Sequence, residues 1–279
     1  MGVALGCLFG WIGGMYAGDV LGWRQDLVAK PHRPIPSGSV SVRSACLCGL
    51  AFALLGCGVL VAINWRALVF VGLTIACYLA YNTVCKDRGL LGDLLAGIAT
   101  SGSVFLIGSL AAGGWPAGRL LPVAGVLLLQ GIFHNLLQTL TDVDGDRRAG
   151  WRTVPVRHGI EITVLLLGLL GAGWLVLAGL LPFLLGHGTA VYFWLLAGSA
   201  WLTAGSLRLI LRAPRPLPRS VALAAYEYHL LDRSVLPAAL LSLAVDPLLV
   251  LVILGVAVVT TRLSARASLH RHELGMPVG

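Results

Sequence analysis

Charged side chains are scarce in this chain, and their scarcity excludes an ordinary soluble domain. Only 11% of its 279 residues are Asp, Glu, Lys or Arg, and 57% are hydrophobic. Soluble domains carry about 25% charged residues. The apolar runs are mostly long enough to cross a hydrocarbon core of roughly 30 Å, and they lack the short alternating pattern of outer-membrane barrel strands. The sequence therefore predicts an all-α integral membrane protein.

Paired Cys-x-x-Cys motifs are absent, and their absence argues against two kinds of site. The six cysteines lie in or at the ends of apolar runs, with no Cys-x-x-Cys pair and no partnering histidine cluster. A zinc site or a redox pair would need such spacing. We therefore expect the cysteines to pack as small apolar side chains.

The apolar runs predict a bundle of about eight to nine transmembrane helices around a central cavity, forming a single domain over residues 1–279. We expect spans at about 2–18, 42–63, 67–82, 93–113, 120–141, 161–185, 189–211, 221–244 and 247–262. Because Asp246-Pro247 interrupts the last two and 221–244 begins amphipathic, an interfacial helix followed by one broken span is an alternative. We expect the first helix to be retained, since no positive segment precedes it, and 263–279 to form a flexible basic tail.

Lys and Arg side chains fall mainly on one side of these spans. If residues 19–41 are cytoplasmic, the segments that alternation places on the same side are 83–92, 142–160 and 212–220. Only Arg66 and Arg119 then lie clearly outside, which is a strong positive-inside bias. This predicts a multi-pass protein of a cytoplasmic or inner membrane. The net charge of +8 is dispersed among loops, which argues against nucleic-acid binding.

Five of the twelve acidic residues form two clusters at the ends of apolar runs. The first cluster is Asp19 and Asp26, and the basic segment 30–38 follows it. The second is Asp142, Asp144 and Asp146, and the basic segment 147–152 follows it. Carboxylates are costly near hydrocarbon, so their concentration at two helix ends indicates a shared task. Carboxylates bind Mg²⁺, and Lys and Arg bind phosphate oxygens. The clusters therefore predict a magnesium-diphosphate site at the cytoplasmic face.

The two clusters belong to a weak internal repeat with an offset of about 120 residues. In both halves an apolar run ends in spaced aspartates, followed by a basic stretch and then Pro and Gly. Such repetition predicts a two-half bundle that shares one cavity. A transporter built from repeats is an alternative, disfavoured because transporters rarely need two acidic clusters with cations at one membrane face.

Three segments resemble motifs of the UbiA superfamily of intramembrane prenyltransferases, which includes terpene cyclases. Residues 142–156 are similar to the family pattern D-x-x-G-D-x-x-x-G-x-x-T-x-P-V. Residues 18–38 resemble the first aspartate-rich motif, which ends in R-P-[IL]-P-S-G. Tyr81-Asn82, Lys86 and Gly89-Leu90-Leu91-Gly92 resemble the family's Y-[SN]…K…G-x-x-G-N segment.

The first motif also departs from the family. Its pattern is N-D-x-x-D-x-x-x-D, and the corresponding residues here are Gly18, Asp19, Gly22 and Asp26. One amide and one carboxylate are therefore missing. We expect metal binding at this cluster to be weaker or differently arranged.

The resemblance implies an enzyme that uses Mg²⁺ to ionise an isoprenyl diphosphate within the membrane, among membrane lipids, and transfers the prenyl group to an aromatic or lipid-like acceptor. A terpene cyclase of the same fold, which needs no acceptor, is the alternative. The altered first motif favours the cyclase, because the family's cyclases tend to deviate there. The aromatic content of only 8% favours transfer, since a cyclase would line its cavity with aromatic rings.

The candidate site residues follow from these patterns. Each acidic pair shares a helix face, because Asp142 and Asp146 are four residues apart and Asp19 and Asp26 are seven residues apart. These four aspartates are the predicted metal ligands and catalytic residues. The predicted diphosphate-binding cations are Arg33, Lys86, Arg147 and Arg43. The predicted polar lining of the cavity is Asn135 and Gln138, beside His134, although hydrogen bonding between helices is an equal alternative for such residues. Tyr81 could shield a carbocation or anchor its helix.

Three further acidic positions have simpler interpretations. Asp144 lies off the Asp142 and Asp146 face, so we expect a solvated loop carboxylate. Asp93 opens a span and is interpreted as its cap. For Asp232 and Arg233 we expect a position at the membrane interface, with an internal ion pair as the alternative.

Overall fold

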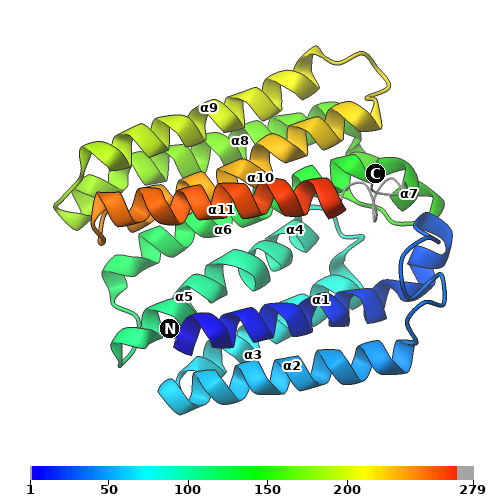
Figure 1. Ribbon diagram of the computed structural model, residues 1–279. Coiled ribbons are helices and arrows are strands. Elements are labelled where there is room, and N and C mark those ends of the chain that lie inside the picture. Colours follow the sequence, from blue (N-terminus) through cyan, green and yellow to red (C-terminus); the bar gives the residue numbers. More distant parts are fainter. Residues whose placement is uncertain (1, 269–279) are drawn as a thin grey trace.

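The computed structural model describes residues 2–268, and this part of the chain is helical without strands (Figure 1). Its long helices are α1 (Gly2–Ala29), α2 (Val42–Ile63), α3 (Ala67–Ala80), α6 (Leu121–Thr141), α8 (Val154–Leu185), α9 (Ala190–Arg212), α10 (Arg219–Leu241) and α11 (Pro247–Ser268). The shorter ones are α4 (Leu90–Gly97), α5 (Ser103–Ser109) and α7 (Val143–Arg148). A π-helical turn, Tyr81–Cys85, extends α3, and another, Ile98–Gly102, joins α4 to α5.

Eight of the described helical segments are long and apolar enough to cross a membrane. They confirm the prediction of an all-helical membrane bundle, and α2 and α6 begin and end within one residue of the expected spans. The helix α10 is too polar to count among the eight, yet it packs along α9 and α6 with Ala225, His229 and Leu236 buried. Its packing inside the bundle favours the expected span at 221–244 over the interfacial alternative.

Three predicted boundaries are also wrong. The first helix does not end at residue 18 but continues to Ala29, because nothing before Pro31 removes a backbone donor. The helix α8 begins at Val154 rather than 161, with a break at Gly159, whose φ is 82°. The helix α11 continues to Ser268, so residues 263–268 of the expected tail are helical, and 269–279 lie outside the described residues.

The C-terminal half contains the larger core. Helices α6, α8, α9 and α10 bury two apolar clusters, whose largest members include Trp174, Tyr192, Phe133, Leu167 and Leu236. A polar network crosses the same interfaces: the fully buried Asp232 accepts hydrogen bonds from Gln130 of α6, at 3.0 Å, and from Ser199 of α9. Asp232 is thus inside the bundle and not at the membrane interface, because two helices supply hydrogen-bond donors to it.

The ends of the bundle agree with the predicted alternation. Figure 1 shows the α1–α2 loop, α7 and the α9–α10 loop together at one end, which we name the α7 end. The N-terminus, the α2–α3 loop and the α8–α9 loop lie at the other end. The orientation of the α7 end towards the cytoplasm stays a prediction.

Helices α1 and α2 approach each other through glycine. A Cβ placed on Gly56 would lie 2.7 Å from the Gly10 nitrogen and 2.7 Å from the Gly6 carbonyl oxygen, both backbone atoms. Close backbone approach through small residues is a common way to pack transmembrane helices. The position of α1, which carries Asp19 and Asp26, therefore depends on this contact.

We predict that Gly56→Ala lowers the thermal midpoint of the detergent-solubilised protein, because the added methyl group must push two backbones apart at a cost of roughly 1 to 3 kcal/mol. Gly58→Ala is the matched control, since a Cβ there meets nothing within 4 Å. It should be neutral or stabilising by up to about 1 kcal/mol, through helix propensity. Equal midpoints for the two variants would contradict the proposed contact.

Candidate active site

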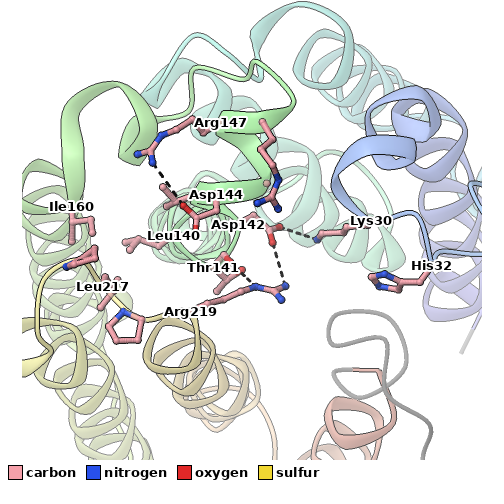
Figure 2. A pocket seen from close by; sticks show the side chains of 15 residues that line it. Lys30, His32, Leu140, Thr141, Asp142, Asp144, Arg147, Ile160, Leu217 and Arg219 are labelled. Carbon is pink, nitrogen blue, oxygen red and sulfur yellow. Dashed lines mark hydrogen bonds and ion pairs between the residues drawn. The ribbon is translucent and has the colours of Figure 1, made fainter.

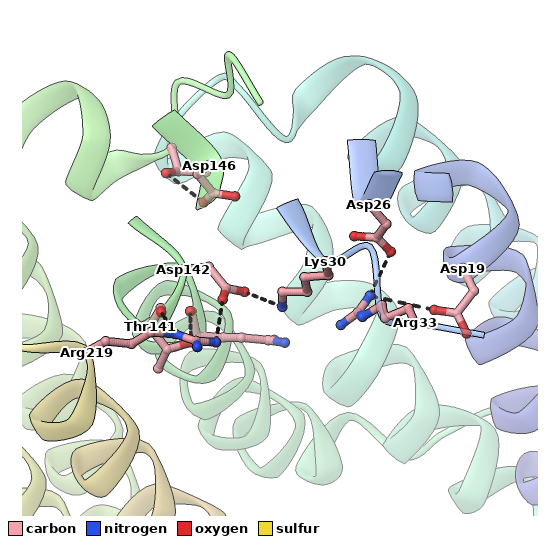
Figure 3. Close-up of polar contacts among 10 residues, drawn as sticks. Asp19, Asp26, Lys30, Arg33, Thr141, Asp142, Asp146 and Arg219 are labelled. Atoms are coloured by element: carbon pink, nitrogen blue, oxygen red, sulfur yellow. Dashed lines mark hydrogen bonds and ion pairs between the residues drawn. The ribbon is translucent and has the colours of Figure 1, made fainter. Parts of the chain in front are cut away.

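The two acidic clusters, at least 116 residues apart in sequence from Asp26 to Asp142, meet at the α7 end (Figure 3). Asp26 lies in the last turn of α1, and Arg33 in the following loop donates to its Oδ2 at 2.9 Å and lies 3.8 Å from Asp19. Lys30 of the same loop reaches the other cluster, with its Nζ 3.0 Å from Asp142 Oδ2. The structure thus brings together the halves that the sequence repeat predicts.

The second cluster lies at Asp142 and on α7, the short helix that follows α6 after Asp142. The backbone leaves the helical region at Asp142, with φ −114° and ψ 10°, but the amide of Asp146 still donates to the Asp142 carbonyl at 2.8 Å. Residues four apart therefore stay on one face, as predicted. The turn ends at Gly150, whose positive φ of 79° suits glycine.

Asp146 is the more enclosed carboxylate of this pair. It is buried, and Thr153 donates to its Oδ2 at 3.1 Å. Burial raises the pKa of Asp146 to about 6, against the opposing effect of the Lys86 ammonium. Lys86 itself lies over the ring of Trp151, with its Nζ 4.9 Å from the ring centroid, in a cation-π contact.

The structure gives a steric reason for one of the two departures in the first motif. A Cβ on Gly18 would collide with the hydroxyl of Tyr78, and that hydroxyl donates to the Gly14 carbonyl at 2.8 Å. An asparagine at position 18 would therefore displace Tyr78. Gly22 has open space around it, so sterics do not explain the missing carboxylate there.

The donor set fits Mg²⁺ held jointly with a substrate. Among the described residues no three His, Cys, Asp or Glu side chains converge on one point. Mg²⁺, however, keeps several waters and is usually bound by one or two carboxylates together with substrate phosphates. Asp142 with Asp146, and Asp19 with Asp26, are two such carboxylate pairs.

A cavity of about 640 Å³ lies beside Asp142 (Figure 2). It is lined from the α1–α2 loop by Lys30 and His32, from α7 by Arg147, and from the start of α10 by Arg219. Arg219 donates through Nε to the Thr141 carbonyl at 3.2 Å, and its Nη2 lies 3.8 Å from Asp142. The cavity is therefore more positive than negative.

Lys30 and Arg219 were not among the predicted site residues. Lys30 could have been found, since it stands in the basic segment four residues after Asp26. Arg219 follows a proline-rich loop, and no sequence signal connects it with Asp142; only the packing of α10 does so.

The predicted cations divide into two groups. Arg33 and Lys86 lie at the clusters, as described above. Arg147 lines the cavity but turns towards Asp144, 3.8 Å away, and both side chains are mostly exposed, as expected for Asp144. The structure does not bring Arg43 to the clusters: it is exposed in the first turn of α2 and makes no ion pair with the described residues.

The polar face of α6 is also divided. Asn135 donates to Asp93 Oδ1 at 2.8 Å, and Tyr81 interacts with both side chains. Asp93 does not cap α4, because its carboxylate bonds across to α6 while no side chain caps the helix. Gln138 is exposed and its side chain makes no hydrogen bond to the described residues.

The pKa of Asp146 has a consequence for the metal-free protein. Because its folded pKa of about 6 lies above the ordinary value of 3.8, the folded state binds the proton more tightly than the unfolded state does, and the contribution of this carboxyl group to stability falls as pH rises between these values. We predict that Asp146→Asn, which cannot ionise, gains on the order of 1 to 3 kcal/mol relative to wild type between pH 4 and pH 7. Chemical unfolding in a chelator measures this difference; a constant difference would contradict the burial effect.

Comparison with known proteins identifies relatives over most of the chain. The model of the UbiA prenyltransferase family matches residues 1–226. A digeranylgeranylglyceryl phosphate synthase of Natronomonas pharaonis is 30% identical over 199 residues, covering 64% of this chain and 70% of the relative. Proteins of the same name from Sulfurisphaera tokodaii and Methanopyrus kandleri are 31% and 33% identical to this chain. The first match covers 54% of both chains and the second 53% of both, so this chain spans about half the length of these two relatives.

Solved structures show the same fold. A UbiA homologue from Aeropyrum pernix superposes with a TM-score of 0.72 at 19% identity, covering 86% of this chain and 88% of that one. A UbiA homologue from Archaeoglobus fulgidus, described as bound to GPP and Mg²⁺, superposes with a TM-score of 0.56 at 17% identity, covering 95% and 87%. With the motifs, the bundle and the family match in agreement, the chain belongs to the UbiA prenyltransferase family.

Proposed function

We propose that this chain uses Mg²⁺ to ionise an isoprenyl diphosphate within the membrane and transfers the prenyl group to a lipid-like acceptor. The observation that carries the proposal is the meeting of two carboxylate pairs from the two halves at one end of the bundle, with Lys30 joining them. The fold relatives described with GPP or DMAPP and Mg²⁺ support the same substrate and ion.

Asp142, Asp146, Asp19 and Asp26 would hold the metal. When bound, Mg²⁺ supplies Lewis acidity that makes the diphosphate a better leaving group. Lys30 and Arg33 place positive charges at both carboxylate pairs, and Lys86 adds a third charge near Asp146. These cations can bind phosphate oxygens and stabilise the charge that develops as the bond to carbon breaks.

The names of the relatives suggest the kind of acceptor. Their product, digeranylgeranylglyceryl phosphate, carries two prenyl chains and a phosphate, so the molecule that receives the second chain is an anionic lipid. The cavity beside Asp142 suits such a head group, because Arg147, Arg148 and Arg219 line it. We propose that the α7 end faces the cytoplasm, as the positive-inside bias indicates.

The terpene cyclase is the second candidate, favoured by the altered first motif at Gly18 and Gly22. An ion-coupled transporter gains no support from the family match. Transferase and cyclase both need the metal and the ionisation step, so only the fate of the prenyl cation separates them.

We predict that Asp142→Asn and Asp146→Asn each reduce turnover of the diphosphate by roughly 100-fold or more, because a lost charged ligand weakens a metal effect worth several kcal/mol. Asp144→Asn is the control, since its mostly exposed carboxylate has only a weak contact with Arg147; its activity should stay within about threefold of wild type. Release of diphosphate measures all three, and full activity in either of the first two variants would reject the metal assignment.

We also predict that acceptor-free incubation with geranyl diphosphate, farnesyl diphosphate or geranylgeranyl diphosphate and Mg²⁺ gives slow hydrolysis to the prenyl alcohol. A transferase must admit a second molecule and so cannot fully exclude water, whereas a cyclase must exclude it. Gas chromatography with mass spectrometry identifies the product. A cyclic terpene as the main product would replace the transferase with the cyclase.

A further inference from the structure

Lys86 differs from Lys30, the other lysine at the proposed metal site, in the kind of partner that it has. Lys30 pairs with the carboxylate of Asp142 at 3.0 Å. The side chain of Lys86 makes no ion pair or hydrogen bond with the described residues, and its ammonium lies over the ring of Trp151, with Nζ 4.9 Å from the ring centroid. A carboxylate neutralises an ammonium, whereas an uncharged ring face attracts it and leaves its charge in place.

The backbone of Trp151 belongs to the same turn as Asp146. The Trp151 amide donates to the Asp146 carbonyl at 2.8 Å, and Gly150, with φ 79°, lets the chain turn between the two residues. Two residues further on, the Thr153 hydroxyl donates to Asp146 Oδ2 at 3.1 Å. The ring under Lys86 and the buried carboxylate of the second acidic pair are therefore fixed by one short segment.

The segment that carries Lys86 is itself packed against that turn. A Cβ on Gly92 would lie 2.5 Å from the Cys85 carbonyl oxygen, so the chain folds tightly around Lys86. A Cβ on Gly89 would lie 3.7 Å from Val154 Cγ2, an ordinary van der Waals distance. The backbones on both sides are thus held in place, and the long Lys86 side chain crosses from one segment to the other.

The Lys86 ammonium is near the second acidic pair without being used up by it. Burial raises the pKa of Asp146 and the Lys86 ammonium lowers it, so the ammonium is close enough to act on that carboxyl group. The two side chains nevertheless form no ion pair. The charge of Lys86 therefore stays available to an anion, and phosphate oxygens form strong hydrogen bonds with such a cation.

We propose that Trp151 is a positioning residue of the diphosphate site: its ring holds the Lys86 ammonium beside Asp146 without neutralising it, so that phosphate oxygens meet a cation already in place. A lysine side chain that is free in the empty site loses rotamer freedom when the diphosphate binds. Restraint by the ring reduces this loss. The inference rests on the proposed ionisation of a prenyl diphosphate. It concerns this chain in particular, because Trp151 stands at a position that the family pattern leaves open.

The affinity for inorganic diphosphate in the presence of Mg²⁺ tests the proposal without turnover. Isothermal titration calorimetry measures it on the detergent-solubilised chain. We expect Trp151→Leu to weaken binding about tenfold, within the range of a single cation-π contact, and Trp151→Phe to stay within about threefold of wild type because it keeps a ring face. Unchanged affinity in Trp151→Leu would overturn the proposal. Tighter binding would also overturn it, since the ring would then hold the lysine away from the diphosphate.

Trp65→Leu is the matched control. Trp65 also stacks on a cation, with the Arg66 guanidinium carbon 5.3 Å from its ring centroid, but it lies in the α2–α3 loop at the other end of the bundle. Its loss should leave the affinity for diphosphate within about threefold of wild type. A tenfold loss in this control as well would show that any missing indole weakens binding and would overturn a specific role for Trp151.

A double-mutant cycle determines whether Trp151 acts through Lys86. We expect Lys86→Met to weaken diphosphate binding, and the addition of Trp151→Leu to weaken it no further. A second tenfold loss in the Lys86→Met background would assign Trp151 to the fold of its turn. Unchanged affinity in Lys86→Met would remove the lysine from the diphosphate site. Either result overturns the proposal.

Fluorinated tryptophans keep the proposal falsifiable if Trp151→Leu fails to fold. Introduced at position 151 alone by stop-codon suppression, they preserve the shape of the ring and withdraw electron density from its face. We expect the affinity for diphosphate to fall stepwise with the number of fluorine atoms, because the attraction of the ring for a cation falls; a flat series overturns the proposal. A wild-type chain that releases no diphosphate from a prenyl diphosphate with Mg²⁺ would instead reject the proposed function, and the inference with it.

Discussion

The contact between Lys30 and Asp142 is the interaction on which the candidate site depends, because it joins the two halves at the α7 end of the bundle. The loop after α1 supplies the cation and the end of α6 the carboxylate, with 3.0 Å between the charged atoms. Neither half alone holds both sets of carboxylates. The glycine contact between α1 and α2 and the core around α6 matter to function for this reason: they determine whether the two helix ends meet.

Much of the fold could be predicted, because apolar run length is a direct consequence of membrane thickness. The runs at α2 and α6 fitted within one residue. The errors arose where a helix carried polar residues. The helix α1 continues past Asp19, since charge at a helix end does not stop a helix whereas proline does. The burial of Asp232 depends on Gln130, 102 residues away, and no local pattern contains that partner.

The candidate site was predictable to a similar degree. Carboxylate spacing identified both acidic pairs, because helix periodicity determines which residues share a face. The cations were harder to predict, since long side chains reach several directions and tertiary packing selects one. Arg43 is exposed and makes no ion pair with the described residues, and Arg147 lies beside Asp144, while Lys30 and Arg219 contact Asp142.

The two carboxylate pairs are not equivalent, and their difference bears on mechanism. Asp146 is buried and accepts a hydrogen bond from Thr153, whereas Asp19 is half exposed. The residue before Asp19 is glycine and not the asparagine of the family motif, because the Tyr78 hydroxyl occupies the space of a side chain there. A preorganised ligand loses less freedom on binding than an exposed one. We therefore expect the second pair to be the better fixed part of the proposed site, and the first pair, on α1, to be the part that adjusts when the diphosphate binds. Lys30 and Arg33, on the loop after α1, are the cations of that half that lie at the carboxylates.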